Sequence, residues 1–185
     1  MLKTADAVVI GGGIMGASTA HFLAKKGFGK VVLLEKRSLA AVSTGHSAAV
    51  VRTFYSNHLT LDLALRALQM FENGPEALGG DCGFRRIGYL CLLAESTLSA
   101  GRQVLELEKA HGAEVVEVSL EEMQEIMPQL HLDGVIGGIL EPHSGYADPV
   151  KTVQSLAGRA KDWGLEVCEG VGATGIRLEH NRVAG

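Results

Sequence analysis

Apolar residues near the start of the chain fall into a short unbroken run, a run at helical spacing and a second short run. The first run, residues 7–10, is rich in β-branched side chains, which is typical of a buried parallel strand. Residues 14–26 carry apolar side chains at helical spacing, and Gly27 ends this predicted helix. Residues 30–34 predict a second strand that ends on Glu35. This order predicts a strand–helix–strand unit of an α/β protein.

After one long loop, the pattern alternates between helices and short strands. Residues 36–57 are polar or small and have no periodicity, which is typical of a functional or mobile loop. Further helices are predicted over residues 59–78, 95–111, 120–127 and 149–163, and further strands over residues 84–93, 114–118, 134–140, 165–168, 175–178 and 182–184. Ser119 and Glu122 have the spacing of a capping box, and Asp148 followed by Pro149 predicts a helix N-cap.

The last two predicted strands form a hairpin that turns at His180 and Asn181, only a few residues before Gly185. The second strand of a hairpin is an unusual place for a domain to end. We therefore expect the chain to be the N-terminal part of a longer polypeptide.

A glycine-rich turn joins the first strand to the first helix. Gly11, Gly13 and Gly16 fill the pattern G-x-G-x-x-G, in which the glycines allow a tight turn, a close pyrophosphate and close helix–strand packing. Glu35 follows roughly 20 residues later, where the fingerprint places an acid for the ribose hydroxyls and disfavours NADP. A glycine turn without a ligand is the alternative, but the register of all these elements favours a dinucleotide. The motif leaves NAD and FAD open.

Composition removes several classes of function. The net charge of −4 and the lack of a Lys/Arg cluster give no reason to expect nucleic acid as a partner. The three cysteines, Cys82, Cys91 and Cys168, have no zinc spacing, so we expect free thiols in a reducing compartment and no metal site. The apolar runs are too short to span a membrane. The first core strand leaves no room for a targeting peptide, so we expect a cytoplasmic protein, with the mitochondrial matrix open for a eukaryotic source.

Five stretches carry a family resemblance: VVIGGGIMGASTAHFLAKKG, LLEK, STGHSAAVVRTFYSN, RRIGYLCLL and GYADPVKTVQSLAGRAKDWGLEV. Together they resemble the D-amino-acid oxidase/sarcosine oxidase family of FAD-dependent oxidoreductases, most of all the β subunits of sarcosine oxidases and proline dehydrogenases and the dimethylglycine dehydrogenases. The resemblance implies an α/β fold with a Rossmann-like FAD-binding domain over residues 1–80 and 148–185. It also implies an inserted α+β substrate domain around residues 81–147, with the C-terminal part of the protein missing.

The resemblance implies positions for the cofactor. Backbone N–H groups of Gly11, Gly13, Ile14, Met15 and Gly16 would contact the FAD pyrophosphate. Glu35 and Lys36 would flank the adenosine ribose, Ser43, Thr44 and Gly45 would run beside the pyrophosphate and ribityl chain, and Ala173 would contact adenine through its backbone. His46 has three interpretations: non-covalent contact with the isoalloxazine, a covalent bond to the flavin, or a loop histidine that faces solvent.

The resemblance also implies a place for the substrate. Arg52 matches an arginine that binds the substrate carboxylate, and a planar guanidinium suits a carboxylate through two parallel hydrogen bonds. A local ion pair or simple exposure is the alternative for Arg52. Tyr55 would line the same pocket, with ordinary packing as its alternative. No residue is assigned a catalytic role.

These features predict an enzyme that oxidises a secondary or tertiary amine or amino acid of the sarcosine, dimethylglycine, proline or glycine type. Hydride would pass to flavin N5, and partner subunits of a heteromeric oxidase or dehydrogenase are expected. The alternatives are a non-catalytic FAD-binding or regulatory subunit and an NAD-dependent dehydrogenase. The 185 residues alone are expected to bind FAD weakly and to be inactive.

Overall fold

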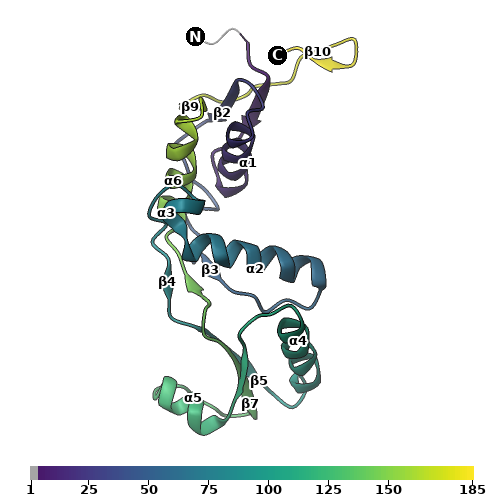
Figure 1. The fold of residues 1–185 in the computed structure, drawn as a ribbon, viewed down its shortest axis with the longest axis vertical. Coiled ribbons are helices and arrows are strands. Elements are labelled where there is room, and N and C mark those ends of the chain that lie inside the picture. Colours follow the sequence, from purple (N-terminus) through teal and green to yellow (C-terminus); the bar gives the residue numbers. More distant parts are fainter. Residues whose placement is uncertain (1–3) are drawn as a thin grey trace. The chain divides into compact units, whose positions relative to one another are not determined.

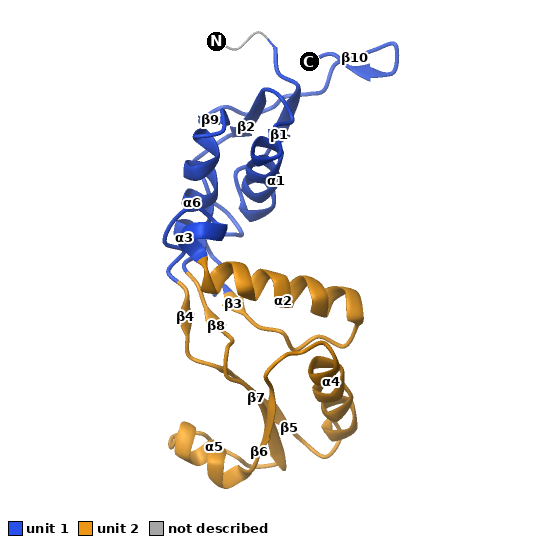
Figure 2. Ribbon diagram, viewed as in Figure 1, with its two compact units in different colours: residues 1–49, 74–83, 148–185 blue, residues 50–73, 84–147 orange. Residues whose placement is uncertain are grey.

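A computed structural model describes residues 4–185, and the chain divides into two compact units (Figures 1 and 2). The first unit comprises Met1–Ala49, Gly74–Gly83 and Asp148–Gly185, and the second comprises Val50–Asn73 and Phe84–Ala147. We expected residues 50–73 to belong with the glycine-rich N-terminal part of the chain. Their contacts group them with the second unit instead. The assignment of FAD and substrate to separate domains stays a prediction.

The first unit is built on a parallel sheet in the order β1-β2-β9. Its strands are β1 (Ala7–Ile10), β2 (Val31–Glu35) and β9 (Glu166–Glu169). Helix α1 (Ile14–Lys25) connects β1 to β2 and packs against α6 (Pro149–Lys161) (Figure 1). The predicted strand–helix–strand unit is therefore confirmed, and the strand that follows α6 extends its sheet.

A small apolar core holds this unit together. Its buried members come from α1, β2, the end of α6 and the turn before β9: Ala20, Ala24, Val31, Leu33, Ala160 and Leu165. Alanines on both helices keep the side chains short where the helices lie against the sheet. Burial of apolar area of this kind supplies most of the favourable free energy of folding.

The second unit contains two antiparallel sheets with helices beside them. One sheet has the order β5-β7-β6, from Tyr89–Leu93, Gly137–Glu141 and Val116–Val118, and the other has the order β3-β8-β4, from Val50–Val51, Gly145–Tyr146 and Arg85–Arg86. The helices are α2 (His58–Glu72), α4 (Leu98–Ala110) and α5 (Leu120–Ile126). Leu93, Leu105, Val115 and Ile139 form its buried apolar cluster.

The predicted helix caps are confirmed. The Ser119 hydroxyl accepts from the Glu122 N–H, and the Glu122 carboxylate accepts from the Ser119 N–H, so both halves of the capping box are present. The Asp148 carboxylate accepts from the N–H groups of Val150 and Lys151 at the start of α6. These side chains satisfy backbone donors that have no acceptor within their own helix.

Two predicted elements need correction. The helix predicted over residues 59–78 is broken into α2 and a short α3 (Gly74–Ala77). The backbone leaves helical geometry at Asn73, and Pro75 has no N–H with which to continue the hydrogen bonds of α2. The strand predicted at residues 175–178 forms later, as β10 (Leu178–Glu179). It pairs with β11 (Arg182–Val183) in the expected hairpin.

Candidate dinucleotide site

The glycine turn lies between β1 and α1, where the backbone passes close to itself. Gly11 has a φ of 105°, a conformation that favours glycine, and its N–H donates to the Leu34 carbonyl at 2.8 Å. A Cβ on Gly16 would lie 1.8 Å from the Gly11 carbonyl oxygen, so only glycine fits there. A Cβ on Gly13 would meet the Thr44 hydroxyl at 3.0 Å. The turn therefore needs glycine at position 11 because of its backbone conformation and at position 16 because of the close backbone contact, whether or not a ligand binds.

The N-terminus of α1 presents backbone N–H groups at this turn, since the first turn of a helix has no internal acceptors for them. The Ile14 N–H donates to the Thr44 hydroxyl oxygen at 3.1 Å, which leaves the hydroxyl proton able to point to another acceptor. Ile14 and Met15 have exposed side chains, Met15 to 79%. The helix start is thus open to a ligand, and Thr44 is positioned beside it.

Glu35 fastens the turn to the sheet. Its carboxylate accepts from the Gly12 N–H and from the Arg37 N–H, each at 2.7 Å. These two hydrogen bonds hold the pKa of Glu35 below its usual value, so the carboxylate is ionised. A Cβ on Gly12 would lie 2.8 Å from the Glu35 Cβ, which explains the middle glycine that the G-x-G-x-x-G pattern leaves unspecified. The sequence pattern indicated the acid and missed its structural bond to Gly12.

The segment around Ala173 is brought beside Glu35. The Val171 N–H donates to the Glu35 carbonyl and the Gly170 N–H to the Arg37 carbonyl, both at 2.9 Å. A Cβ on Gly172 would lie 3.4 Å from the Lys36 Cβ. The structure therefore brings together two predicted adenosine-contacting stretches that lie far apart in the sequence. Lys36 and Ala173 both have exposed side chains.

Residues 38–46 form a folded turn against the glycine turn. The Ala40 N–H donates to the Gly12 carbonyl, and the Gly45 N–H donates to the Ala40 carbonyl, each at 2.9 Å. Ser43 and His46 are exposed, and His46 donates from Nδ1 to the Val42 carbonyl at 2.8 Å. Four predicted residues, Ser43 to His46, are thus held in one turn of the first unit.

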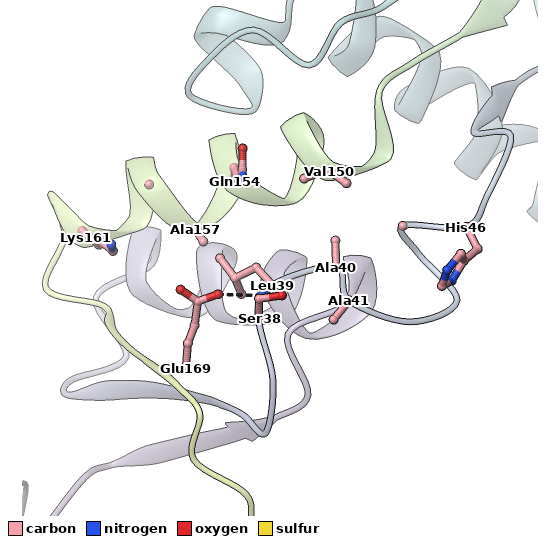
Figure 3. Close-up of a pocket in the computed structure, with 12 residues that line it drawn as sticks. Ser38, Leu39, Ala40, Ala41, His46, Val150, Gln154, Ala157, Lys161 and Glu169 are labelled. Atoms are coloured by element: carbon pink, nitrogen blue, oxygen red, sulfur yellow. Dashed lines mark hydrogen bonds between the residues drawn. The ribbon is translucent and has the colours of Figure 1, made fainter.

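A cavity of about 560 Å³ lies between residues 38–46 and α6 (Figure 3). Figure 3 draws its lining: Ser38, Leu39, Ala40, Ala41, Gly45, His46, Val150, Gln154, Ala157, Gly158, Lys161 and Glu169. The Leu39 N–H donates to the Glu169 carboxylate at 2.6 Å across it. Of the predicted residues it includes Gly45 and His46, whereas the fingerprint glycines lie outside its lining.

Arg52 and Tyr55 lie in the second unit and contact each other. The Arg52 guanidinium carbon is 4.6 Å from the centre of the Tyr55 ring and 5.4 Å from that of Tyr89. Its Nη1 also donates to the Phe54 carbonyl. Within residues 4–185 Arg52 forms no ion pair, and its role as a carboxylate anchor stays a prediction. Cation–π contact with two rings restrains the guanidinium, and donors other than the one bonded to Phe54 remain on it.

A buried acidic pair next to Arg52 was missed in the sequence. Glu108 of α4 is 0% exposed and Glu141 of β7 is 2% exposed. Burial, followed by the charge of Glu141, raises the pKa of Glu108 to about 7, although Thr53 and Arg52 oppose this. Glu108 continues the buried stripe of Gly101, Val104 and Leu105. Helical spacing could therefore have indicated a buried glutamate.

The described residues contain no group of three or more His, Cys, Asp or Glu side chains that could hold a metal ion. Among the same residues there is also no helix with the length and apolar character needed to cross a membrane.

A sheet with a glycine turn, an acid at the end of β2 and an open α1 N-terminus defines a dinucleotide-binding protein. The FAD dependent oxidoreductase (DAO) family matches residues 6–185, so the chain belongs to that family. This membership selects FAD from the two dinucleotides that the fingerprint left open. It also confirms the family resemblance and the fold class.

Known relatives cover most of this chain, which spans only part of each of them. Mitochondrial sarcosine dehydrogenase of Mus musculus is 31% identical over 95% of this chain and 19% of its own length. Sarcosine oxidase subunit beta of Arthrobacter sp is 27% identical, over 99% of this chain and 47% of its own. The solved structure of L-proline dehydrogenase from P. horikoshii superposes with a TM-score of 0.90 at 28% identity, over 99% of this chain and 48% of that one.

Proposed function

We propose that this chain holds the FAD of an oxidoreductase that oxidises an amine or amino acid of the sarcosine, dimethylglycine, proline or glycine type. The observation that carries the proposal is the glycine turn fastened to Glu35 at the open N-terminus of α1. When bound, FAD supplies at N5 an acceptor for hydride from the carbon next to the substrate nitrogen. The resulting imine would then be hydrolysed by water.

Backbone groups of the turn would bind the pyrophosphate. The N–H groups of Gly13, Ile14, Met15 and Gly16 belong to the helix start, and Gly11 sets the direction of the turn. The Thr44 hydroxyl, which already accepts from the Ile14 N–H, would donate its own proton to a phosphate oxygen. Ser43 and Gly45 would contribute from the same turn.

Glu35 would bind the adenosine ribose. Each of its oxygens accepts one backbone N–H and keeps a further lone pair for a ribose hydroxyl. Because the carboxylate is ionised and fixed in place, it would bind hydroxyls without reorganising. Lys36 and the backbone of Ala173 would complete the adenosine side of the site.

His46 would contact the flavin without a covalent bond. Since Nδ1 donates to the Val42 carbonyl, Nε2 is the nitrogen that remains for a ligand. Acid precipitation of the FAD-loaded protein tests this assignment. Flavin that stays in the supernatant supports non-covalent contact, whereas flavin that stays with the pellet shows a covalent link.

Arg52 would bind the carboxylate of the substrate, and Tyr55 would line that pocket. The stacked guanidinium has donors left for two parallel hydrogen bonds to a carboxylate. A carboxylate anchor accounts for a preference for amino acids over simple amines.

The name of the sarcosine oxidase subunit beta relative supports partner subunits for this protein as well. A cytoplasmic location stays a prediction that cell fractionation can test.

Anaerobic titration of the FAD-loaded full-length protein with sarcosine, dimethylglycine, proline and glycine tests the function. We expect at least one of them to bleach the oxidised flavin spectrum, because hydride transfer reduces the flavin. FAD that none of them reduces would indicate a non-catalytic FAD-binding subunit.

Substitution of Arg52 by alanine tests the carboxylate anchor. Arg52→Ala should raise the KM for the active amino acid by about tenfold or more, as expected for a lost charge-assisted pair. The exposed Arg66 in the same unit supplies the control, and Arg66→Ala should leave KM unchanged. An unchanged KM in Arg52→Ala would remove this role from Arg52.

A further inference from the structure

Thr53, the residue after Arg52, is clamped between two buried carboxyl groups. Its N–H donates to Oε2 of Glu141 and its hydroxyl donates to Oε1 of Glu108, each at 2.7 Å. The Ser144 hydroxyl donates to the same Oε2 of Glu141. Thr53 is 3% exposed, so water does not compete for these bonds. The clamp fixes the backbone from which the Arg52 side chain projects.

Each carboxyl group leaves one oxygen without a partner. Among the described residues, Oε2 of Glu108 and Oε1 of Glu141 are buried side-chain atoms that accept no hydrogen bond. A buried carboxylate oxygen without a partner is costly, and a proton on one of the two groups removes part of that cost. The pair is therefore built to hold a proton.

Glu72, Glu114 and His143 line a cavity together with Thr53 and Glu141. Three groups act directly on the electrostatic balance around Glu108 or share it. Arg52 is the cation that acts on it, and Glu141 is the anion that opposes its ionisation. Cys91 of β5 faces the same three charges, and burial together with Glu141 raises the pKa of its thiol, so it stays neutral. With Glu108 protonated, the charges of Glu141 and Arg52 cancel. With Glu108 ionised, the cluster carries an excess negative charge.

We propose that the protonation of Glu108 controls how tightly Arg52 binds a carboxylate ligand. This inference rests on the proposed role of Arg52 as the carboxylate anchor. A ligand carboxylate brings a further negative charge to the cluster, which a protonated Glu108 tolerates and an ionised Glu108 opposes. The proton comes from solvent and remains on the glutamate pair, so no covalent step is involved. Glu108 is thus a positioning residue that acts through Thr53 and Arg52.

Linkage makes the effect reciprocal. If protonation of Glu108 raises the affinity for the carboxylate, then carboxylate binding raises the affinity of Glu108 for its proton. Carboxylate binding near neutral pH should therefore take up protons. Affinity for the carboxylate should fall as pH rises through 7, where Glu108 loses its proton. An amine without a carboxylate makes no demand on Arg52 and should show no such loss.

Calorimetric titration of the FAD-loaded full-length protein with pyrrole-2-carboxylate tests this inference. The probe carries a carboxylate beside a ring nitrogen but has no hydride to give, so binding is measured apart from turnover. We expect binding to weaken about fivefold or more between pH 6 and pH 8.5, the lower end of typical coupling between sites. Titrations at pH 7 in buffers of different ionisation enthalpy should reveal proton uptake.

Variants separate this inference from the proposed function. Glu108→Gln should bind the probe at pH 8.5 as tightly as at pH 6 and without proton uptake, whereas exposed Glu106→Gln on the same helix should behave as the parent protein. Parent-like pH dependence in Glu108→Gln would overturn this inference alone. Arg52→Ala that binds the probe as the parent does, or a parent that binds no probe at all, would overturn the carboxylate anchor and this inference together.

Discussion

Replacing Glu108 with glutamine should remove a pH dependence from the stability of the second unit. Glu108 is fully buried, and its pKa is raised from 4.5 to about 7. The folded state therefore holds the proton more tightly than the unfolded state does. This contribution to stability is complete below pH 4.5 and is lost as pH rises through 7. Between pH 5 and pH 8 the loss amounts to about 2.5 kcal/mol.

Hydrogen exchange of the α4 and β7 amides measures this loss locally, after correction for the intrinsic pH dependence of exchange. In the parent protein the opening free energy should fall by about 2.5 kcal/mol from pH 5 to pH 8. Glutamine copies the neutral acid, so Glu108→Gln should fall by about 2.5 kcal/mol less than the parent over this range and exceed the parent at pH 8. Hydrogen bonds to Glu72 and Glu114 raise the pKa of His143 in the same unit, and its titration should affect both proteins alike. Glu106→Gln, exposed on the same helix, is the control and should fall as the parent does. If Glu108→Gln loses as much protection as the parent between pH 5 and pH 8, or is less protected at pH 8, then Glu108 does not cause this pH dependence.

Three further results are expected. Gly16→Ala places a Cβ 1.8 Å from the Gly11 carbonyl oxygen, so it should abolish FAD retention through gel filtration and lower stability by about 1–3 kcal/mol, measured by urea denaturation. Burial lowers the pKa of His21, so the contribution of the neutral imidazole to stability is present above pH 6.5 and is lost as pH falls below that value. His21→Leu should therefore flatten the acid side of a plot of melting temperature against pH. Ser119→Ala removes one half of the capping box and should cost about 1 kcal/mol by urea denaturation, while Ser119→Thr should retain most of it.

Local patterns predicted the parts of the fold that local physics determines. The strand before Gly11, the helix after Gly13 and the cap at Ser119 each follow from neighbouring residues, and the structure has all three. The break between α2 and α3 was missed because the predicted helix was carried across Pro75 as far as residue 78. Proline breaks helical backbone regardless of the apolar spacing around it.

The hydrogen-bond partners of the site could not be predicted in the same way. The bonds from Gly12 to Glu35 and from Thr53 to Glu108 and Glu141 join residues far apart in the sequence. Which donor meets which carboxylate depends on how the elements pack, and periodicity carries no such information. Glu108 was a detectable case because a charged residue on an apolar stripe implies burial with a partner.

We propose above all that the glycine turn between β1 and α1 holds FAD. The most direct test is the visible spectrum of the purified protein, followed by identification of the nucleotide that heat or acid releases. We expect flavin absorption bands and released FAD in the full-length parent protein, and loss of both in Gly16→Ala. A nicotinamide nucleotide in place of FAD, or flavin bound equally well by Gly16→Ala, would contradict it.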